Sequence, residues 1–208
     1  MTGTGRLIVV GGHSRHVGKT TLVMTLLQCL EPAQWVAVKI SGHSHRRGPG
    51  PLPGEFDERA ALQSARFREA GARNALLLRA PDDRFADAAA TVQGLVDAGN
   101  NVIAESNRLV AWCKPDLVLF VVAPAISDWK PSSGLCLRAA DAIVTFGEHA
   151  LSGRAHASHD DVGLGLPRFH LDGGQLQTKA LVSLLRRRLH PTGAASSSFG
   201  RDAIMRSA

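Results

Sequence analysis

Short apolar runs alternate with longer amphipathic stretches along most of this chain. The apolar runs are typical of strands buried on both faces of a sheet, and the stretches between them have the spacing of helices that cover such a sheet. This alternation predicts βαβ units and a parallel sheet. The predicted strands are residues 6–10, 35–40, 74–78, 101–104, 116–122, 142–146 and 167–171.

Four helices are predicted between these strands, at residues 19–30, 57–70, 82–98 and 175–189. Pro32 ends the first helix, and Gly71 and Gly99 stand where a left-handed residue closes the second and third. A chain of 208 residues is long enough for one α/β domain with a well-buried core. We therefore expect a single domain over residues 1–190, a mostly parallel sheet with helices on both faces.

Two segments have compositions that do not favour regular structure. Residues 41–54 contain three prolines and four glycines, which predicts a mobile loop. The serine, alanine and glycine content of residues 191–208 predicts a disordered C-terminal tail.

The bulk composition excludes several classes of protein. No apolar run approaches the ~20 residues that span a bilayer, and the first residues lack the layout of a secretory signal, so we expect a cytoplasmic protein. The three cysteines, Cys29, Cys113 and Cys136, lack the spacing of a disulfide framework or a zinc site. The net charge of +6 raises nucleic acid as a partner. The arginines are mostly scattered and no tyrosine is present, so we do not expect that partner.

The stretch between the first predicted strand and the first predicted helix contains a phosphate-binding motif. Successive backbone N–H groups and a helix N-terminus concentrate positive potential where phosphate oxygens bind. In such loops a glycine allows close approach, a lysine bridges the outer phosphates and the next hydroxyl coordinates Mg²⁺. Gly18, Lys19 and Thr20 fill these three roles, with Lys19 also a catalytic residue. The predicted nucleotide-binding residues are Gly12, His13, Ser14, Arg15, His16, Val17, Gly18, Lys19, Thr20 and Thr21.

The spacing of this motif departs from the usual G-x-x-x-x-G-K-[ST] pattern at its first position. That pattern would place its first glycine at position 13, which is His13 here, and the glycine falls one residue earlier, at Gly12. The preceding strand, the following helix and the position near the N-terminus all agree with the motif. We therefore expect a nucleoside triphosphate, GTP or ATP, and Mg²⁺ at this loop.

The chain resembles two families of P-loop proteins. The shifted phosphate loop is similar to that of dethiobiotin synthetase, an ATP-dependent ligase. The remainder resembles the MobB family, the GTP-binding adaptors of molybdopterin-guanine dinucleotide synthesis. Three features carry the second resemblance: V-A-V-K ending at Lys39 and followed by G-H-S-H at 42–45, S-A-R-F-R-E-A-G-A at 64–72, and V-I-A-E ending at Glu105. Both families belong to the P-loop group that includes the urease and hydrogenase metallochaperone GTPases.

The resemblance to MobB covers the first half of the chain and weakens after Glu105. Position 63, where the adaptors usually carry aspartate, is Gln63, and the glycine that usually follows the strand-end glutamate is Ser106. These differences are compatible with a divergent branch that serves a different client.

Three further residues are candidates for the chemistry of the site. Glu105 ends a predicted strand beside the phosphate loop, where a carboxylate would hold Mg²⁺ together with Thr20. Asp57 opens a predicted helix and is a second candidate metal ligand, although aspartate at a helix start is also a routine cap. Resemblance to both families implies that Lys39 contacts phosphate or the acceptor substrate and is catalytic. The alternative is a lysine whose stem covers the strand end.

His13, His16, His43 and His45 lie on two loops that leave the same predicted sheet edge. Imidazole clusters bind Zn²⁺ or Ni²⁺. Because no cysteine or further acidic ligand stands near them, we favour histidines that line the phosphate loop or face solvent. Asp128-Trp129-Lys130 follows the most apolar strand, at a place where GTPases carry N-K-x-D. That motif is absent, so the base is not assigned.

The leading hypothesis is a GTP-binding adaptor similar to MobB, with slow hydrolysis and a molybdenum cofactor enzyme or nucleotidyltransferase as its partner. The alternatives are an ATP-dependent ligase or small-molecule kinase similar to dethiobiotin synthetase, and a metal-delivery GTPase. Because related P-loop proteins dimerise across the nucleotide site, we also expect a homodimer.

Overall fold

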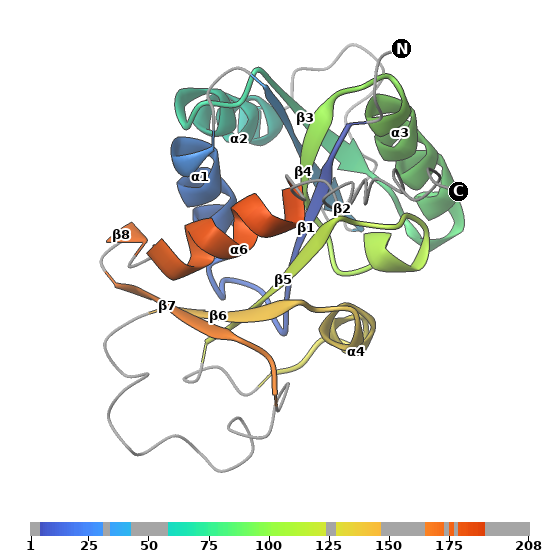
Figure 1. The fold of residues 1–208 in the computed structure, drawn as a ribbon. Helices are drawn as coiled ribbons and strands as arrows, with labels where there is room; N and C mark the ends of the chain where they lie inside the picture. The colour runs from blue at the N-terminus through green and yellow to red at the C-terminus, as the bar shows by residue number, and fades with distance from the viewer. Residues whose placement is uncertain are drawn as a thin grey trace, which may run out of the picture.

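The computed structural model has one eight-stranded sheet at its centre, with the strand order β3-β2-β4-β1-β5-β6-β7-β8 (Figure 1). The first seven strands in sequence pair in parallel, and β8 pairs antiparallel with β7. The strands are β1 (Leu7–Gly12), β2 (Trp35–Ser41), β3 (Asn74–Arg79), β4 (Asn101–Glu105), β5 (Leu117–Val122), β6 (Ala142–Phe146), β7 (Arg168–Asp172) and β8 (Gln175–Leu176). The structure describes residues 5–30, 34–42, 58–123, 128–146, 165–172, 175–176 and 179–189.

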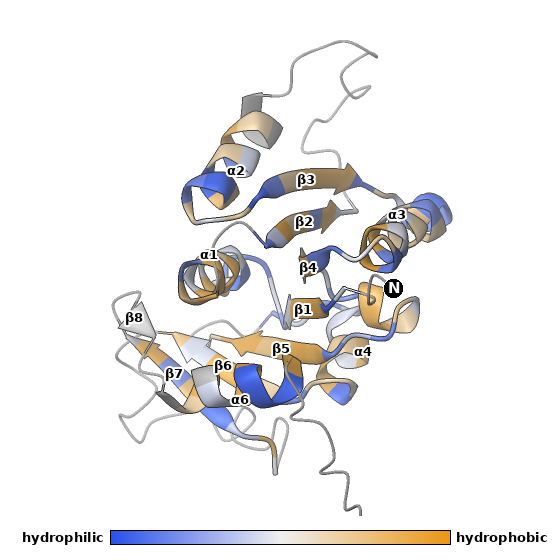
Figure 2. Cartoon of the chain, turned by 45° about the horizontal axis from the view of Figure 1, so that its top comes forward, coloured by the Kyte–Doolittle hydropathy of each residue, from blue (hydrophilic) through white to orange (hydrophobic). Residues whose placement is uncertain are grey.

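Helices cover both faces of this sheet, and Figure 2 shows α1 and α3 on opposite sides of the apolar strands. One buried cluster joins the sheet to α1 (Lys19–Cys29), α2 (Glu58–Glu69) and α6 (Lys179–Leu189). A second cluster joins the other face to α3 (Phe85–Asp97), α4 (Ser133–Arg138) and the short turn η2 (Leu109–Ala111). A 3₁₀ turn, η1 (Asp82–Arg84), precedes α3.

The central strands are apolar throughout because both of their faces are buried. Side chains of a strand alternate between the two faces. Ile8 and Val10 of β1 therefore enter the cluster under α1, whereas Leu7 and Val9 enter the cluster under α3. β5 alternates in the same way, and all six of its residues are buried.

The strand order brings several carboxyl ends together beside β1. β4 and β5 flank β1, so the chain changes direction across the sheet at this strand. Glu105 is in register with Val10 of β1 and with Lys39 of β2. Parallel sheets bind ligands outside the carboxyl ends of their strands, at such a switch point. The topology therefore places the end of β1 and its following loop at the centre of the candidate site.

The predicted α/β class, with a mostly parallel sheet and helices on both faces, is confirmed. Three elements differ from the prediction. The helix predicted at 175–189 begins only at Lys179, because residues 175–176 pair with the end of β7. β1 continues two residues further, since Gly11 and Gly12 still pair with β5. α4 lies in a stretch for which no helix was predicted.

Some predictions fall on residues that the structure does not describe. These include most of the predicted mobile loop, the tail at 191–208, and the candidate residues Asp57, His43 and His45. In the described part of the chain, no helix has the length and apolar character needed to cross a membrane.

Candidate functional site

The loop between β1 and α1 begins after Gly12 and ends at Gly18, which has a φ of 99°. Glycine suits this left-handed conformation, and a Cβ at this position would lie 2.6 Å from the ring of Phe146. No side chain of the described residues caps α1. The N–H groups of its first turn are therefore not taken up by a side-chain cap, an arrangement that suits an anion.

A buried histidine explains why the motif is shifted by one position. The backbone N–H of His13 donates to the carbonyl oxygen of Val121 on β5, at 3.2 Å. The His13 side chain is fully buried, and its ring lies 5.0 Å from that of Trp129. A Cβ on Gly12 would approach both the Val121 carbonyl oxygen and the Val17 side chain to 2.9 Å. The glycine is thus needed at position 12, and position 13 anchors the loop to β5.

Asn107 fixes the start of the loop from the other side. Its Oδ1 accepts a hydrogen bond from the Gly12 N–H at 2.7 Å, and its Nδ2 donates to the Gly12 carbonyl at 2.9 Å. The backbone N–H of Ser106 donates to the carbonyl of Val10 at 3.1 Å. Ser106, noted above only as a departure from the adaptor pattern, and the adjacent Asn107 therefore tie the end of β4 to the phosphate loop.

Thr20, Glu105 and Lys39 form a hydrogen-bonded group beside the loop. The Thr20 hydroxyl donates to Glu105 Oε2 at 2.7 Å, and Lys39 Nζ lies 3.3 Å from Glu105 Oε1 and 3.2 Å from the Thr20 hydroxyl. Lys39 also donates to Gln63 Oε1 at 3.3 Å. Alternation along β2 and β4 places Lys39 and Glu105 on the face that α1 covers. The structure thus brings together three of the predicted site residues.

Lys19 folds back over the loop, where its ammonium donates to the carbonyl oxygen of Ser14. Burial lowers the pKa of Lys19 from 10.5 to about 8. Glu105 counteracts this shift, whereas the charges of Lys130 and Lys39 lower the pKa of Lys19 further. A bound polyanion would favour the ammonium form and compete with the Ser14 carbonyl for it.

Asp128-Trp129-Lys130 lies against the phosphate loop. The Lys130 N–H donates to the His13 carbonyl at 2.8 Å, and the Ser14 hydroxyl donates to Asp128 at 3.4 Å. Trp129 packs between His13 and Phe120. The segment is thus part of the wall of the phosphate loop, whereas its sequence was considered above only for reading the nucleotide base.

The other predicted site residues take different positions along the loop. Ser14 and Val17 are buried, whereas Arg15, His16 and Thr21 are exposed. His16 has a φ of 58°, a left-handed conformation that histidine adopts more readily than most residues. In the described ranges, no three histidine, cysteine, aspartate or glutamate side chains gather as metal ligands would. Within these ranges, His13 and His16 therefore belong to no group of three or more such side chains.

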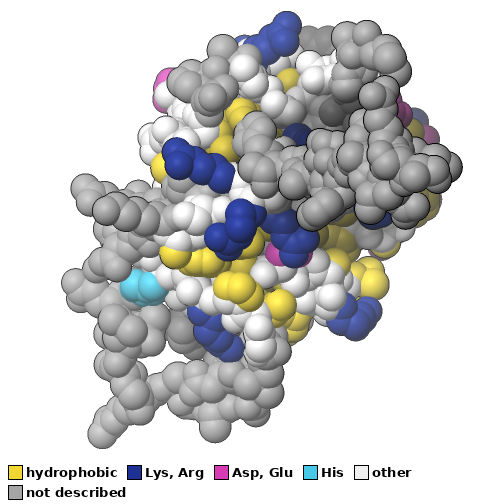
Figure 3. Space-filling view, in the orientation of Figure 1, with side chains coloured by type: hydrophobic (Ala, Val, Ile, Leu, Met, Phe, Trp, Pro, Cys, Tyr) yellow, Lys and Arg dark blue, Asp and Glu magenta, His cyan; other side chains and the backbone are white. Residues whose placement is uncertain are grey.

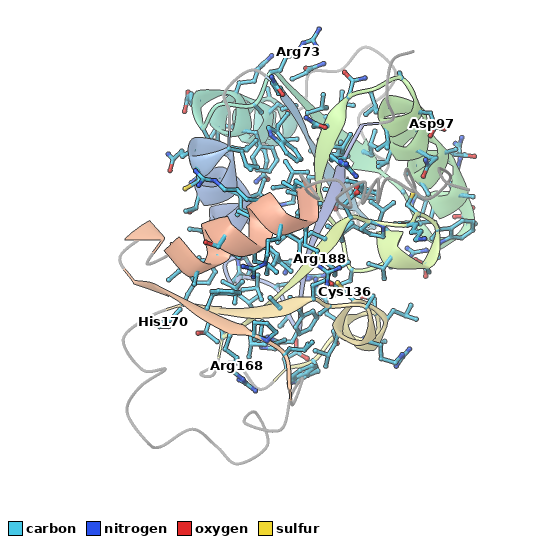
Figure 4. All side chains as sticks on the ribbon, in the orientation of Figure 1. Arg73, Asp97, Cys136, Arg168, His170 and Arg188 are labelled. Atoms are coloured by element: carbon cyan, nitrogen blue, oxygen red, sulfur yellow. The ribbon has the colours of Figure 1, made fainter. Side chains whose placement is uncertain are left out.

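The remaining basic and thiol groups have structural surroundings. Figure 3 shows the described lysines and arginines of this face as separate small groups, one of which lies beside an acidic side chain. Arg188 of α6 pairs with Asp141 at 2.6 Å. Cys136 of α4 lies against the sheet (Figure 4), and burial raises its pKa to about 12, so the thiol stays protonated and inert. The three cysteines are free.

Comparison with known proteins gives a relative in structure but none in sequence. No family model matches the chain, and no curated protein matches it. The chain is similar in structure to HypB from Helicobacter pylori, solved in complex with nickel. The TM-score is 0.53 at 13% identity, over 93% of this chain and 92% of that one. This likeness confirms the predicted fold class, an α/β domain with a mostly parallel sheet and helices on both faces.

Replacing Asn107 with alanine should lower the free energy of unfolding by about 2 to 3 kcal/mol, because the N–H and the C=O of Gly12 both lose a partner. Urea denaturation measures this change. The matched control is Asn74→Ala, which removes an exposed side chain that accepts a hydrogen bond from the N–H of the next residue and should change stability by less than about 0.5 kcal/mol. Equal effects of the two substitutions would contradict the role of Asn107.

Lys19 should titrate with a midpoint near pH 8 in the free protein. NMR of ¹³C-methylated lysines measures this midpoint, and Lys19→Arg identifies the resonance. The unfolded chain binds this proton more tightly than the folded chain does. The free energy of unfolding should therefore rise as the pH increases from about 8 towards 10.5. Inorganic triphosphate should move the midpoint upwards. A lysine spectrum in which every midpoint lies near 10.5 would refute the assignment.

Proposed function

We propose that this chain is a Mg²⁺-dependent P-loop GTPase with slow hydrolysis, which acts in the maturation of a metal-containing cofactor. The observation that carries the nucleotide part is the contact of 2.7 Å between the Thr20 hydroxyl and Glu105, beside Lys19 and Lys39. It joins the end of the phosphate loop to the carboxyl end of the neighbouring strand. This is where P-loop proteins hold Mg²⁺ and the outer phosphates.

The residues at the site fit this role by their chemistry. The Thr20 hydroxyl and the Glu105 carboxylate are the hard oxygen ligands that Mg²⁺ prefers, and they would hold it directly or through water. Bound there, Mg²⁺ would neutralise charge on the β- and γ-phosphates. Lys19 would bind the outer phosphates, and Lys39 would approach the same end of the nucleotide from β2.

The same contacts support slow hydrolysis. A general base has to accept a proton from the attacking water. The Glu105 carboxylate already accepts from Thr20 and pairs with Lys39, so it is poorly placed for that task. Binding and a change of conformation would then be the main output of the nucleotide cycle.

Two kinds of metal-cofactor protein fit this proposal. The fold likeness to HypB, solved with nickel, favours a metal-delivery GTPase. The sequence likeness to MobB supports the adaptor instead, with a molybdenum cofactor enzyme or nucleotidyltransferase as its partner. An ATP-dependent ligase or kinase would be indicated if the protein selected ATP over GTP and turned over an acceptor.

Glu105→Gln should remove most of the Mg²⁺-dependence of triphosphate binding, because the amide keeps the shape of the side chain but loses its charge. We expect the affinity for the Mg²⁺–nucleotide complex to fall about tenfold or more, with little change in the affinity for the metal-free nucleotide. Calorimetric titrations with and without Mg²⁺ test this. The exposed Glu69→Gln serves as control, and a Glu105→Gln protein with unchanged Mg²⁺-dependence would refute the proposed ligand.

Equilibrium dialysis against micromolar Ni²⁺ or Zn²⁺ separates the two kinds of cofactor protein. A metal-delivery GTPase should retain about one ion per chain or per dimer, and the retention should change when GTP is added. Because imidazole is a common ligand of both ions, the double substitution His43→Ala and His45→Ala should lower retention. If the protein retains neither ion, the metal-delivery function is excluded and the adaptor function remains as the interpretation.

A further inference from the structure

Lys130 is held beside the phosphate loop by contacts of its neighbours and its own backbone. Its N–H donates to the His13 carbonyl at 2.8 Å, and its carbonyl accepts from the N–H of Ser133 at 2.9 Å, at the start of α4. Trp129 lies with its ring 5.0 Å from the buried His13 ring. The position of Lys130 is therefore fixed by the wall of the loop on one side and by α4 on the other.

The side chain of Lys130 stands among the charges of the site. It acts electrostatically on Lys19, and it is itself acted on by Arg15, Glu105, Asp128 and Lys39. It is half-buried. Within the described part of the chain, its ammonium makes no hydrogen bond or ion pair, in contrast to Lys19 and Lys39, which both have partners. A partly desolvated cation without a partner is the kind of group that an anionic ligand stabilises.

The charges around the loop match a triphosphate. Four cations (Arg15, Lys19, Lys39 and Lys130) and two carboxylates (Glu105 and Asp128) give the site a formal excess of two positive charges. A nucleoside triphosphate with Mg²⁺ carries about two negative charges, and a diphosphate with Mg²⁺ about one. Loss of the terminal phosphate would therefore leave one of these cations without compensation.

We propose that Lys130 binds the terminal phosphate of the nucleotide and makes the affinity of the site depend on that phosphate. This inference rests on the nucleotide binding proposed above. Lys19 is the motif lysine, Lys39 is already bound to Glu105 and Thr20, and Arg15 is exposed to solvent. Among these four cations, Lys130 is therefore the half-buried one whose charge is available. Because its backbone joins the phosphate loop to α4, the contact also gives α4 and β5 a physical link to the state of the nucleotide.

Calorimetric titration of the whole chain with a diphosphate and with a non-hydrolysable triphosphate analogue, in the GTP and ATP series and with Mg²⁺, tests this inference. Lys130→Ala should weaken triphosphate binding by about tenfold to hundredfold, the range for a hydrogen bond to a charged group. Diphosphate binding should change by less than about threefold. Lys114→Ala, which removes an exposed lysine before β5, should change neither affinity. Lys130→Arg should restore part of the triphosphate preference.

The outcomes are distinguishable. If the wild-type chain binds nucleotide but Lys130→Ala weakens both ligands equally, or neither, the inference is wrong and the proposed function stands. If the wild-type chain binds neither ligand, the proposed function fails and the inference with it. Lys130→Met, which keeps the aliphatic stem, replaces the alanine variant if thermal unfolding shows that the latter is not folded. If Lys130 binds an anionic acceptor substrate instead of the terminal phosphate, Lys130→Ala should keep the wild-type preference for triphosphate over diphosphate. That result would overturn the inference.

Discussion

Residues near the carboxyl ends of three neighbouring strands are aligned, and the site depends on that register. Lys39 of β2, Glu105 of β4 and Val10 of β1 lie side by side, so the phosphate loop leaves β1 two residues beyond this carboxylate and this lysine. A shift of one residue along β4 would turn Glu105 to the opposite face. The hydrogen bond from Thr20 to Glu105 then connects α1 to this edge. Strand register, rather than any single motif residue, sets the geometry of the site.

The phosphate loop is held in place from two sides. Asn107 binds both polar groups of the Gly12 backbone, and His13 anchors the loop to β5. These contacts fix the start of the loop, and such preorganisation favours the binding of a ligand. Burial lowers the pKa of Lys19, and the neighbouring Lys130 and Lys39 lower it further, so an anion bound beside Lys19 would favour its ammonium form.

Much of the fold could be predicted from the sequence, because buried parallel strands give continuous apolar runs and the phosphate loop has a known pattern. Lys39 and Glu105 could also be placed, since each ends such a run. Asn107, His13 and Lys130 could not be given their roles. Their partners lie far away in the chain, 95 residues in the case of Asn107 and Gly12, and depend on how β4, β1 and β5 are aligned. The short β8 could not be distinguished from the helix that follows it, because two residues show no periodicity.

We expect the loop from Gly12 to Thr21 to bind a nucleoside triphosphate. The decisive test is titration calorimetry of the wild-type chain and of Lys19→Ala with GTP and ATP in the presence of Mg²⁺. One nucleotide should bind per chain, with GTP preferred, and the affinity should be about a hundredfold lower in the variant. Selective binding of ATP would keep the site but point to a ligase or kinase. A wild-type chain that binds neither nucleotide, or a variant that binds as well as the wild type, would contradict the claim.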